Sequence, residues 1–120
     1  MFRERVLAGP PVWYRVRDLD AARRFYRETL GFDETAIDFG QRWSHLRHGE
    51  MEIGLIEGDP DPDGAVAHVD VVDIKAEADR LRAAGVDVGI VVELQGEMRL
   101  LDVYDPDGNR VQLAQELFRA

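Results

Sequence analysis

Apolar and polar residues follow the same order twice along the chain. In each half an alternating stretch comes first, then apolar residues recur at helical spacing, and three short alternating stretches follow. An aspartate precedes each helical stretch and a glycine ends it. The offset is 55 residues from Asp18 to Asp73 and 54 residues from Gly31 to Gly85. This self-similarity predicts a tandem duplication of one structural unit.

Each unit is predicted to hold one helix that packs on a sheet. The aspartate can cap the helix by accepting hydrogen bonds from its first free amides, and the glycine can adopt the left-handed exit. The apolar residues recur every three or four positions, which places them on one helix face. They are Leu19, Ala22, Phe25, Tyr26 and Leu30 in the first helix, and Ile74, Ala78, Leu81 and Gly85 in the second.

The alternating stretches predict the strands. One strand opens each unit; further strands are expected at about 33–39, 42–47 and 51–56, and at about 87–93, 98–104 and 110–114. Residues 58–64 have no apolar side chain except proline and are predicted to form a linker. We therefore expect an α+β fold with one domain over 1–120. Its two βαβββ modules span about 8–57 and 65–116 and stand in pseudo-symmetric tandem.

Composition narrows the possible partners. The 120 residues suffice for one domain with one core, and 24 acidic against 15 basic residues give a net charge of −9. This excess argues against nucleic acid and anionic membranes as partners. It is compatible with a cationic small molecule as ligand, and equally with a charge that only keeps the protein in solution. There is no cysteine, no apolar run of membrane-spanning length and no signal-peptide pattern, so we expect a cytoplasmic protein. A single lysine beside fourteen arginines is typical of a GC-rich bacterial genome.

Strand alternation also predicts which side chains line a cleft. Val12, Tyr14 and Val16 are expected to face the helix, which turns Trp13 and Arg15 to the opposite side. Applied to every strand, this argument predicts a ligand-binding set of Trp13, Arg15, Trp43, His45, His68, Asp70, Tyr104 and Gln112. Indole rings beside a few polar groups suit a planar or amphipathic ligand. The alternatives are that the tryptophans pack at a dimer interface and that the histidines are structural.

No known catalytic pattern occurs, and the catalytic residues stay unassigned. The sequence has no Ser-His-Asp arrangement, phosphate loop or dinucleotide fingerprint. His68 and Asp70 share a strand face, and an acid–base pair there is one alternative. The acidic run from Asp59 to Gly64 imitates the spacing of a calcium loop, but two prolines and flanking strands favour a solvated linker.

The chain resembles the vicinal oxygen chelate superfamily. The resemblance lies in Val16-Arg17-Asp18-Leu19-Asp20-Ala21-Ala22-Arg23-Arg24-Phe25-Tyr26, in Leu30-Gly31-Phe32, and in the turn Asp105-Pro106-Asp107-Gly108-Asn109 before Val111-Gln112-Leu113. That superfamily includes glyoxalase I, extradiol dioxygenases, fosfomycin-modifying enzymes and bleomycin-resistance binding proteins. The resemblance implies two curved mixed sheets around a cleft. It also implies a homodimer in which each cleft takes walls from both chains.

The resemblance further implies four metal-ligand positions. In this chain they fall on Pro11, Gly54, Val66 and Gln112, and only the last has a side chain that can bind a metal. We therefore predict no cofactor. The alternative is one divalent metal ion. It would be held by His68 and Gln112 if the strand register of module two is shifted by two residues, from Val66 to His68, or by a wider set that adds His45 and Glu52.

These arguments predict a protein that binds a small organic molecule, rather than an enzyme. By resemblance, one concrete role is to sequester an antibiotic or another toxic aromatic metabolite, which would make it an antibiotic-resistance protein. The alternative is a metal-dependent lyase, isomerase or dioxygenase of the same superfamily. A third possibility is an accessory protein whose cleft is vestigial.

Overall fold

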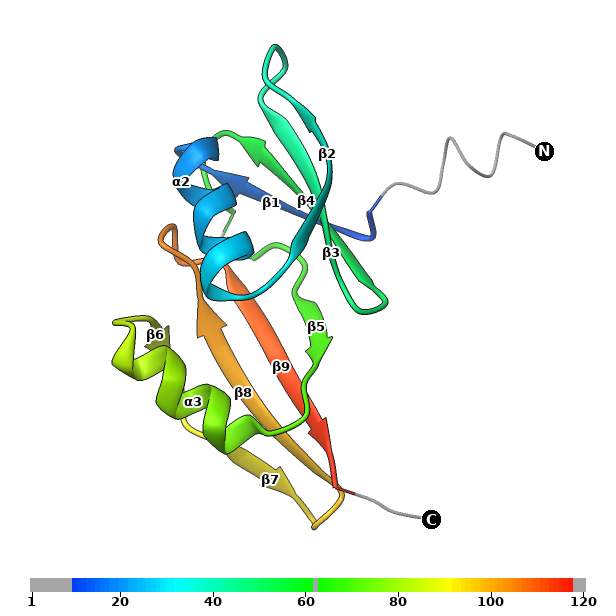
Figure 1. Cartoon of the computed structure of the whole chain (residues 1–120), viewed down its shortest axis with the longest axis vertical. Helices are drawn as coiled ribbons and strands as arrows, with labels where there is room; N and C mark the ends of the chain where they lie inside the picture. Colours follow the sequence, from blue (N-terminus) through cyan, green and yellow to red (C-terminus); the bar gives the residue numbers. More distant parts are fainter. Residues whose placement is uncertain (1–9, 62, 118–120) are drawn as a thin grey trace, which may run out of the picture.

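Two βαβββ modules follow each other along the chain (Figure 1). This computed structural model describes residues 10–61 and 63–117. Module one consists of β1 (Val12–Val16), α2 (Leu19–Arg24), η1 (Phe25–Thr29), β2 (Asp33–Asp38), β3 (Trp43–His48) and β4 (Met51–Glu57). Module two consists of β5 (Ala67–Asp70), α3 (Ile74–Ala83), β6 (Asp87–Val88), β7 (Val92–Leu94), β8 (Met98–Tyr104) and β9 (Arg110–Glu116).

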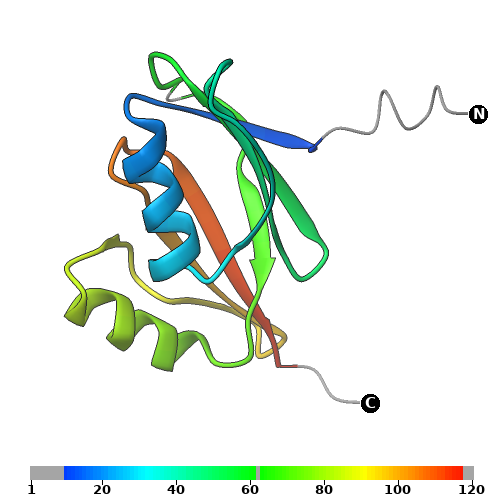
Figure 2. The same ribbon diagram turned by 45° about the horizontal axis from the view of Figure 1, so that its top comes forward.

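The strand order is the same in both modules. Sheet one has the order β1-β4-β3-β2 and sheet two the order β5-β9-β8-β6, with β7 also paired to β8. The opening strand runs parallel to the closing strand in each, and the other pairs are antiparallel. Both helices lie on the same side of the molecule and leave the other face of each sheet open (Figure 2). The predicted tandem α+β fold is confirmed.

Both helices begin at the predicted aspartates. The Asp18 carboxylate accepts from the amide of Ala21 at 3.2 Å, and the Asp73 carboxylate accepts from the amide of Ala76 at 3.1 Å. A second cap comes from the closing strand of each module and is repeated in both. The Glu57 carboxylate accepts from the amide of Leu19, and the Gln115 side-chain oxygen accepts from the amide of Ile74, each at 2.9 Å. Together they satisfy two of the free amides at each helix start.

Three details differ from the sequence prediction. The first helix continues after Arg24 as a π-helical turn, η1. Gly85 was expected in the buried stripe but is exposed, because it adopts the left-handed exit with φ of 82°. The single strand expected at about 87–93 is two short strands. At Gly89, between them, the amide still donates to the carbonyl of Asp102 on β8 at 2.8 Å, and the ladder breaks after this residue. There the carbonyl accepts from Arg82 of α3 at 2.9 Å.

One apolar core extends through both modules, and two tyrosines join them. The Tyr14 hydroxyl of β1 accepts from the amide of Ala67 at 2.9 Å and donates to the carbonyl of Arg110. The Tyr26 hydroxyl donates to the Asp105 carboxylate at 2.8 Å. Asp105 opens the Asp-Pro-Asp-Gly-Asn turn, so this turn positions module two against the helix of module one.

Burial keeps these hydroxyls protonated. It raises the pKa of Tyr14 to about 12 and the pKa of Tyr26 well above its usual value. Burial also raises the pKa of the Asp105 carboxyl. The two tyrosines therefore donate hydrogen bonds throughout the neutral pH range and hold the modules together.

The helices of the described residues are short, and none has the length and apolar character that a membrane span requires.

Candidate functional site

Three aromatic side chains form a continuous surface on the open face of sheet one. Trp13 meets His45 edge to face at a centroid distance of 5.2 Å, and Trp43 lies at 4.6 Å from the same imidazole with a tilt of 31°. The strand register explains this, because Trp13 and His45 are both paired with Gly54 of the strand between them. We call Trp13, Trp43 and His45 the aromatic face.

Gly54 makes this arrangement possible. The indole of Trp13 lies directly over it, and a Cβ added at position 54 would stand 2.4 Å from the Cε3 atom of Trp13. Any larger residue would therefore displace the indole. The glycine itself is buried, although it lies on the open side of the sheet. Gly54 thus acts as the floor on which the aromatic face rests.

The aromatic face is uncovered in the single chain. Trp13 is 41% exposed, and the neighbouring Ile56 is 36% exposed. Arg15 is paired with Ile56 in the strand register and is also exposed. Trp43 and His45 are half-buried. An indole and an isoleucine side by side on a sheet form the kind of apolar surface that a ligand or another chain covers.

A polar group occupies the open face of sheet two. His68 is paired with Gln112 across the parallel strands β5 and β9. The Gln112 amide donates to one oxygen of Asp102 at 3.2 Å, and Arg110 donates to the other oxygen at 3.2 Å. Asp102 therefore orients the Gln112 side chain so that its amide oxygen is left as an acceptor. We call His68, Gln112, Asp102 and Arg110 the polar face.

The structure places the eight sequence-predicted residues in two groups. Trp13, Arg15, Trp43 and His45 lie on sheet one, and His68, Asp70, Tyr104 and Gln112 lie on sheet two. No hydrogen bond, ion pair or ring contact among the described residues joins one group to the other. Tyr104 lines a hollow beside the linker, whereas His68 and Asp70 line one beside the β3–β4 turn. In β1 and β5 burial follows the predicted alternation, but alternation carries no information on how the sheets are placed.

Two features of the site were not predicted as such. Gly54 was considered only as a lost metal-ligand position, although it supports the indole of Trp13. His48 was not considered, yet its ring packs against Phe32 at 5.3 Å where the two modules meet. The sequence does show one sign of this residue, because His48 lies at the end of β3 just before the Gly49 turn.

The residues present do not fit the metal site that the fold family implies. Position 54 has no side chain and is covered by Trp13, so of the two closing-strand positions only Gln112 offers a side-chain oxygen. Glu52, which belongs to the wider alternative set of metal ligands, forms an ion pair with Arg47 at 3.1 Å. Among residues 10–61 and 63–117, no three His, Cys, Asp or Glu side chains come close enough to hold a metal ion. A tight site needs more ligands than these positions provide.

The described part of the acidic linker forms a turn. The Asp61 carboxylate accepts from the amide of Asp63 at 3.0 Å, and the Asp61 carbonyl accepts from the amide of Gly64 at 3.1 Å. The aspartates at 61 and 63 are exposed to solvent. Of this run, position 62 lies outside the described residues. The local geometry is that of a solvated turn.

Comparison with known proteins establishes the family. The model of the Glyoxalase/Bleomycin resistance protein/Dioxygenase superfamily matches residues 9–113. The chain therefore belongs to this superfamily. No curated protein matches the chain.

Solved structures share the fold. An integron cassette protein from the mobile metagenome of Halifax Harbour sewage outfall has a TM-score of 0.77 and 23% identity, over 90% of this chain and 97% of the other. A bleomycin resistance determinant encoded on transposon Tn5 has a TM-score of 0.69 and 19% identity, over 89% and 96%. The fosfomycin resistance protein FosX from Listeria monocytogenes has a TM-score of 0.71 and 20% identity, over 87% and 88%.

Proposed function

We propose that this protein binds a small organic molecule on its aromatic face, without a metal ion. The observation that carries this proposal is the indole of Trp13, which is held flat over Gly54 and touches the ring of His45. A residue with a Cβ at position 54 would prevent this, and a metal-ligating side chain there would take the same space. The geometry favours an aromatic surface at position 54, where the resemblance implies a metal ligand.

Such a surface binds planar molecules by stacking. Offset or edge-to-face aromatic pairs contribute about 0.5–1.5 kcal/mol each beyond the burial of apolar area. Trp13 and Trp43 provide two such contacts, and His45 between them can exchange hydrogen bonds with a polar edge of the ligand. The net charge of −9 favours a ligand that carries positive charge.

We infer that a second copy of the chain completes the cleft. A ligand on the aromatic face of one chain alone stays open to water on its other side, because the polar face lies on a different sheet and makes no ring contact or hydrogen bond with these rings within the described chain. In a homodimer, the polar face of the partner covers the aromatic face. Gln112 and His68 would then supply the directional hydrogen bonds that a flat aromatic surface lacks.

The concrete role we propose is the sequestration of an antibiotic or another toxic aromatic metabolite. Support comes from the absence of a fitting metal-ligand set in the described chain, which leaves stoichiometric capture as the simplest use of the cleft. It also comes from the shared fold with the bleomycin resistance determinant of transposon Tn5.

Equilibrium titration with bleomycin tests this role. Calorimetry of the full chain, prepared with and without EDTA, is expected to show saturable binding of bleomycin in both preparations. Mass spectrometry of the recovered compound is expected to show it unchanged. Fosfomycin has no aromatic ring that could stack on the indoles, so it is expected not to bind in either preparation. Chemical conversion of either compound, dependent on added Mn²⁺, would contradict the proposal and favour a metal-dependent enzyme.

A further inference from the structure

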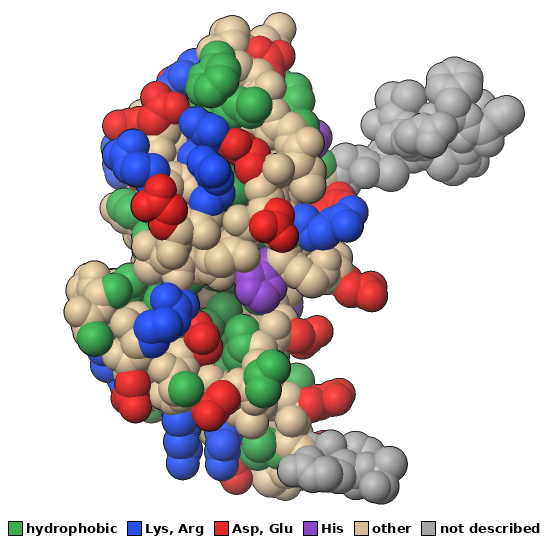
Figure 3. All heavy atoms as spheres, in the orientation of Figure 1, with side chains coloured by type: hydrophobic (Ala, Val, Ile, Leu, Met, Phe, Trp, Pro, Cys, Tyr) green, Lys and Arg blue, Asp and Glu red, His purple; other side chains and the backbone are tan. Residues whose placement is uncertain are grey.

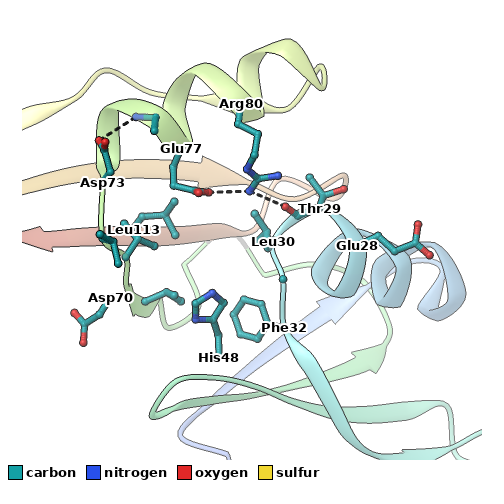
Figure 4. Close-up of a pocket in the computed structure, with 15 residues that line it drawn as sticks. Glu28, Thr29, Leu30, Phe32, His48, Asp70, Asp73, Glu77, Arg80 and Leu113 are labelled. Atoms are coloured by element: carbon teal, nitrogen blue, oxygen red, sulfur yellow. Dashed lines mark hydrogen bonds and ion pairs between the residues drawn. The ribbon is translucent and has the colours of Figure 1, made fainter.

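The hollow at the waist of the molecule holds contacts between the modules. Figure 3 shows it beside a histidine and apolar surface, and Figure 4 shows the side chains that line it. The Arg80 guanidinium reaches from α3 to module one, donating to Glu77 at 2.8 Å and to the carbonyl of Thr29 at 3.0 Å. The Asp70 carboxylate points away from the hollow (Figure 4). A polar group that is both held in place and turned to the open side lies on sheet two.

This group is the side-chain amide of Gln112. It is paired with Asp102 across β8 and β9, and directly opposed residues of two strands share one face of the sheet. The Nε2 atom of Gln112 donates to Oδ1 of Asp102 at 3.2 Å. A carboxylate only accepts hydrogen bonds, so a flipped amide would bring two oxygens together. Asp102 therefore leaves the amide oxygen of Gln112 as the atom that a ligand can address.

Asp102 is itself fixed by its surroundings. Its other carboxylate oxygen accepts from Arg110 at 3.2 Å, and its backbone carbonyl accepts from the amide of Gly89 at 2.8 Å. The backbone carbonyl of Arg110 in turn accepts from the Tyr14 hydroxyl of module one. The orientation of Gln112 is thus set by contacts that reach into the core. A side chain that is oriented before a ligand arrives loses less freedom on binding.

The internal repeat puts this row of side chains where sheet one has the aromatic face. Across β1, β4 and β3 and across β5, β9 and β8, the register pairs in the same order Trp13, Gly54 and His45, and His68, Gln112 and Asp102. Gln112 is thus the counterpart of Gly54, the residue beneath the indole of Trp13. A cleft made from both rows offers ring surfaces on one side and an amide oxygen on the other.

We propose that Asp102 determines which ligand edge the cleft accepts, by holding Gln112 as a hydrogen-bond acceptor. The ligand class that follows is a planar aromatic molecule with an N–H donor at its edge. The aromatic face binds the ring by stacking, and the partner's Gln112 accepts from the N–H group. Asp102 is a positioning residue, because it acts through Gln112. This inference rests on the proposed function and on its homodimer.

Nuclear magnetic resonance of the nitrogen-15-labelled full chain tests this selection, with indole and benzofuran as probes. The two probes share one shape, but only indole has an N–H group. Indole is expected to bind about three- to tenfold more tightly, given the usual strength of one neutral hydrogen bond. It should shift the side-chain N–H signals of the tryptophans and the side-chain amide signals of Gln112. Benzofuran should shift the tryptophan signals alone.

Two variants separate the roles of Asp102 and Gln112. Asp102→Asn keeps the shape but can donate as well as accept, so it lets the Gln112 amide turn over. Gln112→Leu removes the amide oxygen. In both variants the preference for indole is expected to fall below about twofold, while both probes still shift the tryptophan signals. Asp79→Asn is the control, because Asp79 is exposed on α3, on the helix side of the sheets. Thermal melts check that all variants are folded.

This inference and the proposed function fail in different ways. Equal binding of the two probes to the wild type, or unchanged Gln112 signals with indole, would overturn the inference and leave the aromatic face as a ligand site. A preference for indole that persists in Asp102→Asn would overturn the role of Asp102. If neither the probes nor bleomycin shifts the tryptophan signals, the proposed function is wrong and the inference falls with it.

Discussion

Trp13 and Gly54 depend on each other at the scale of single residues. The alternation Val12, Trp13, Tyr14 predicts that the indole turns away from the core, and the structure confirms this. The close approach to Gly54 was not predictable in the same way. It requires the parallel pairing of β1 with β4, two strands that are far apart in the sequence. Local patterns report the face of a residue but not its through-space neighbour.

A substitution at Gly54 measures this dependence. Gly54→Ala is expected to displace the indole of Trp13, because the new Cβ would stand 2.4 Å from its Cε3 atom. The expected cost is about 1–3 kcal/mol of unfolding free energy, as for other overpacked sites, with a shift in tryptophan emission. Urea unfolding followed by fluorescence measures both. Gly89→Ala is the control, since its nearest neighbour would be 3.7 Å away. Equal stability of the two variants would contradict the geometry.

The hydroxyl of Tyr26 provides a second test at this scale. Tyr26→Phe leaves the buried Asp105 carboxylate without one of its donors, at an expected cost of about 1–3 kcal/mol. Tyr104→Phe is the matched control, because the Tyr104 hydroxyl makes no hydrogen bond within the described chain and the side chain is half-buried. Chemical denaturation of the two variants gives the comparison. A loss no greater than that of the control would show that this bond does not hold the modules together.

At the scale of elements, start signals were predictable and irregular segments were not. The aspartate caps and glycine exits of both helices follow from local chemistry, and so did the position of each strand in module one to within about two residues. The π-helical turn and the break after Gly89 have no signal in the pattern of apolar and polar residues. The Arg82 guanidinium donates a hydrogen bond to the carbonyl of Gly89, and an alternation of apolar and polar residues does not predict such a bond.

A bidentate ion pair joins α2 to β2 and makes stability depend on pH. Arg23 donates to Glu34 at 2.6 and 2.7 Å, and this holds the pKa of the Glu34 carboxyl below its usual value of 4.5. A carboxyl with a lowered pKa in the folded state stabilises it fully above the unfolded pKa and loses that contribution as the pH falls through the folded pKa.

Glu34→Gln is therefore expected to unfold at lower urea concentration at neutral pH. Its midpoint should change less than that of the wild type as the pH falls below about 4.5, so that the two curves approach each other in acid. Glu93→Gln is the control, because its pair with Arg99 is more exposed and exposed pairs contribute little. A constant difference between Glu34→Gln and wild type across the acid range would argue against this ion pair as the cause.

At the scale of the whole molecule, the cleft could not be assembled from the sequence. Alternation assigned Trp13 and His68 to open faces, but the placement of the two sheets depends on buried contacts such as Tyr14 with Ala67. The expected cleft residues therefore lie in two groups within one chain. In the homodimer that we propose, a second copy unites them, which is a property of the assembly rather than of any local pattern.

The mass of the assembly tests that union. Light scattering is expected to show two chains of 13.6 kDa each in the particle. Ile56→Arg, beside the aromatic face, is expected to shift the mass toward one chain because it buries an unpaired charge in the interface. Ile90→Arg is the control, since Ile90 is 79% exposed at another place. A single-chain mass for the wild type would show that the aromatic face is not covered by a second copy.

The central claim is that the aromatic face binds the ligand, and the tryptophans report on it directly. The chain has two tryptophans and both lie on this face. The decisive measurement is the emission of Trp13 during a bleomycin titration, in a Trp43→Phe variant that leaves one indole. We predict saturable quenching with the same midpoint as binding measured by calorimetry. Bleomycin binding that leaves the emission of Trp13 unchanged, or no binding at all, would contradict the account.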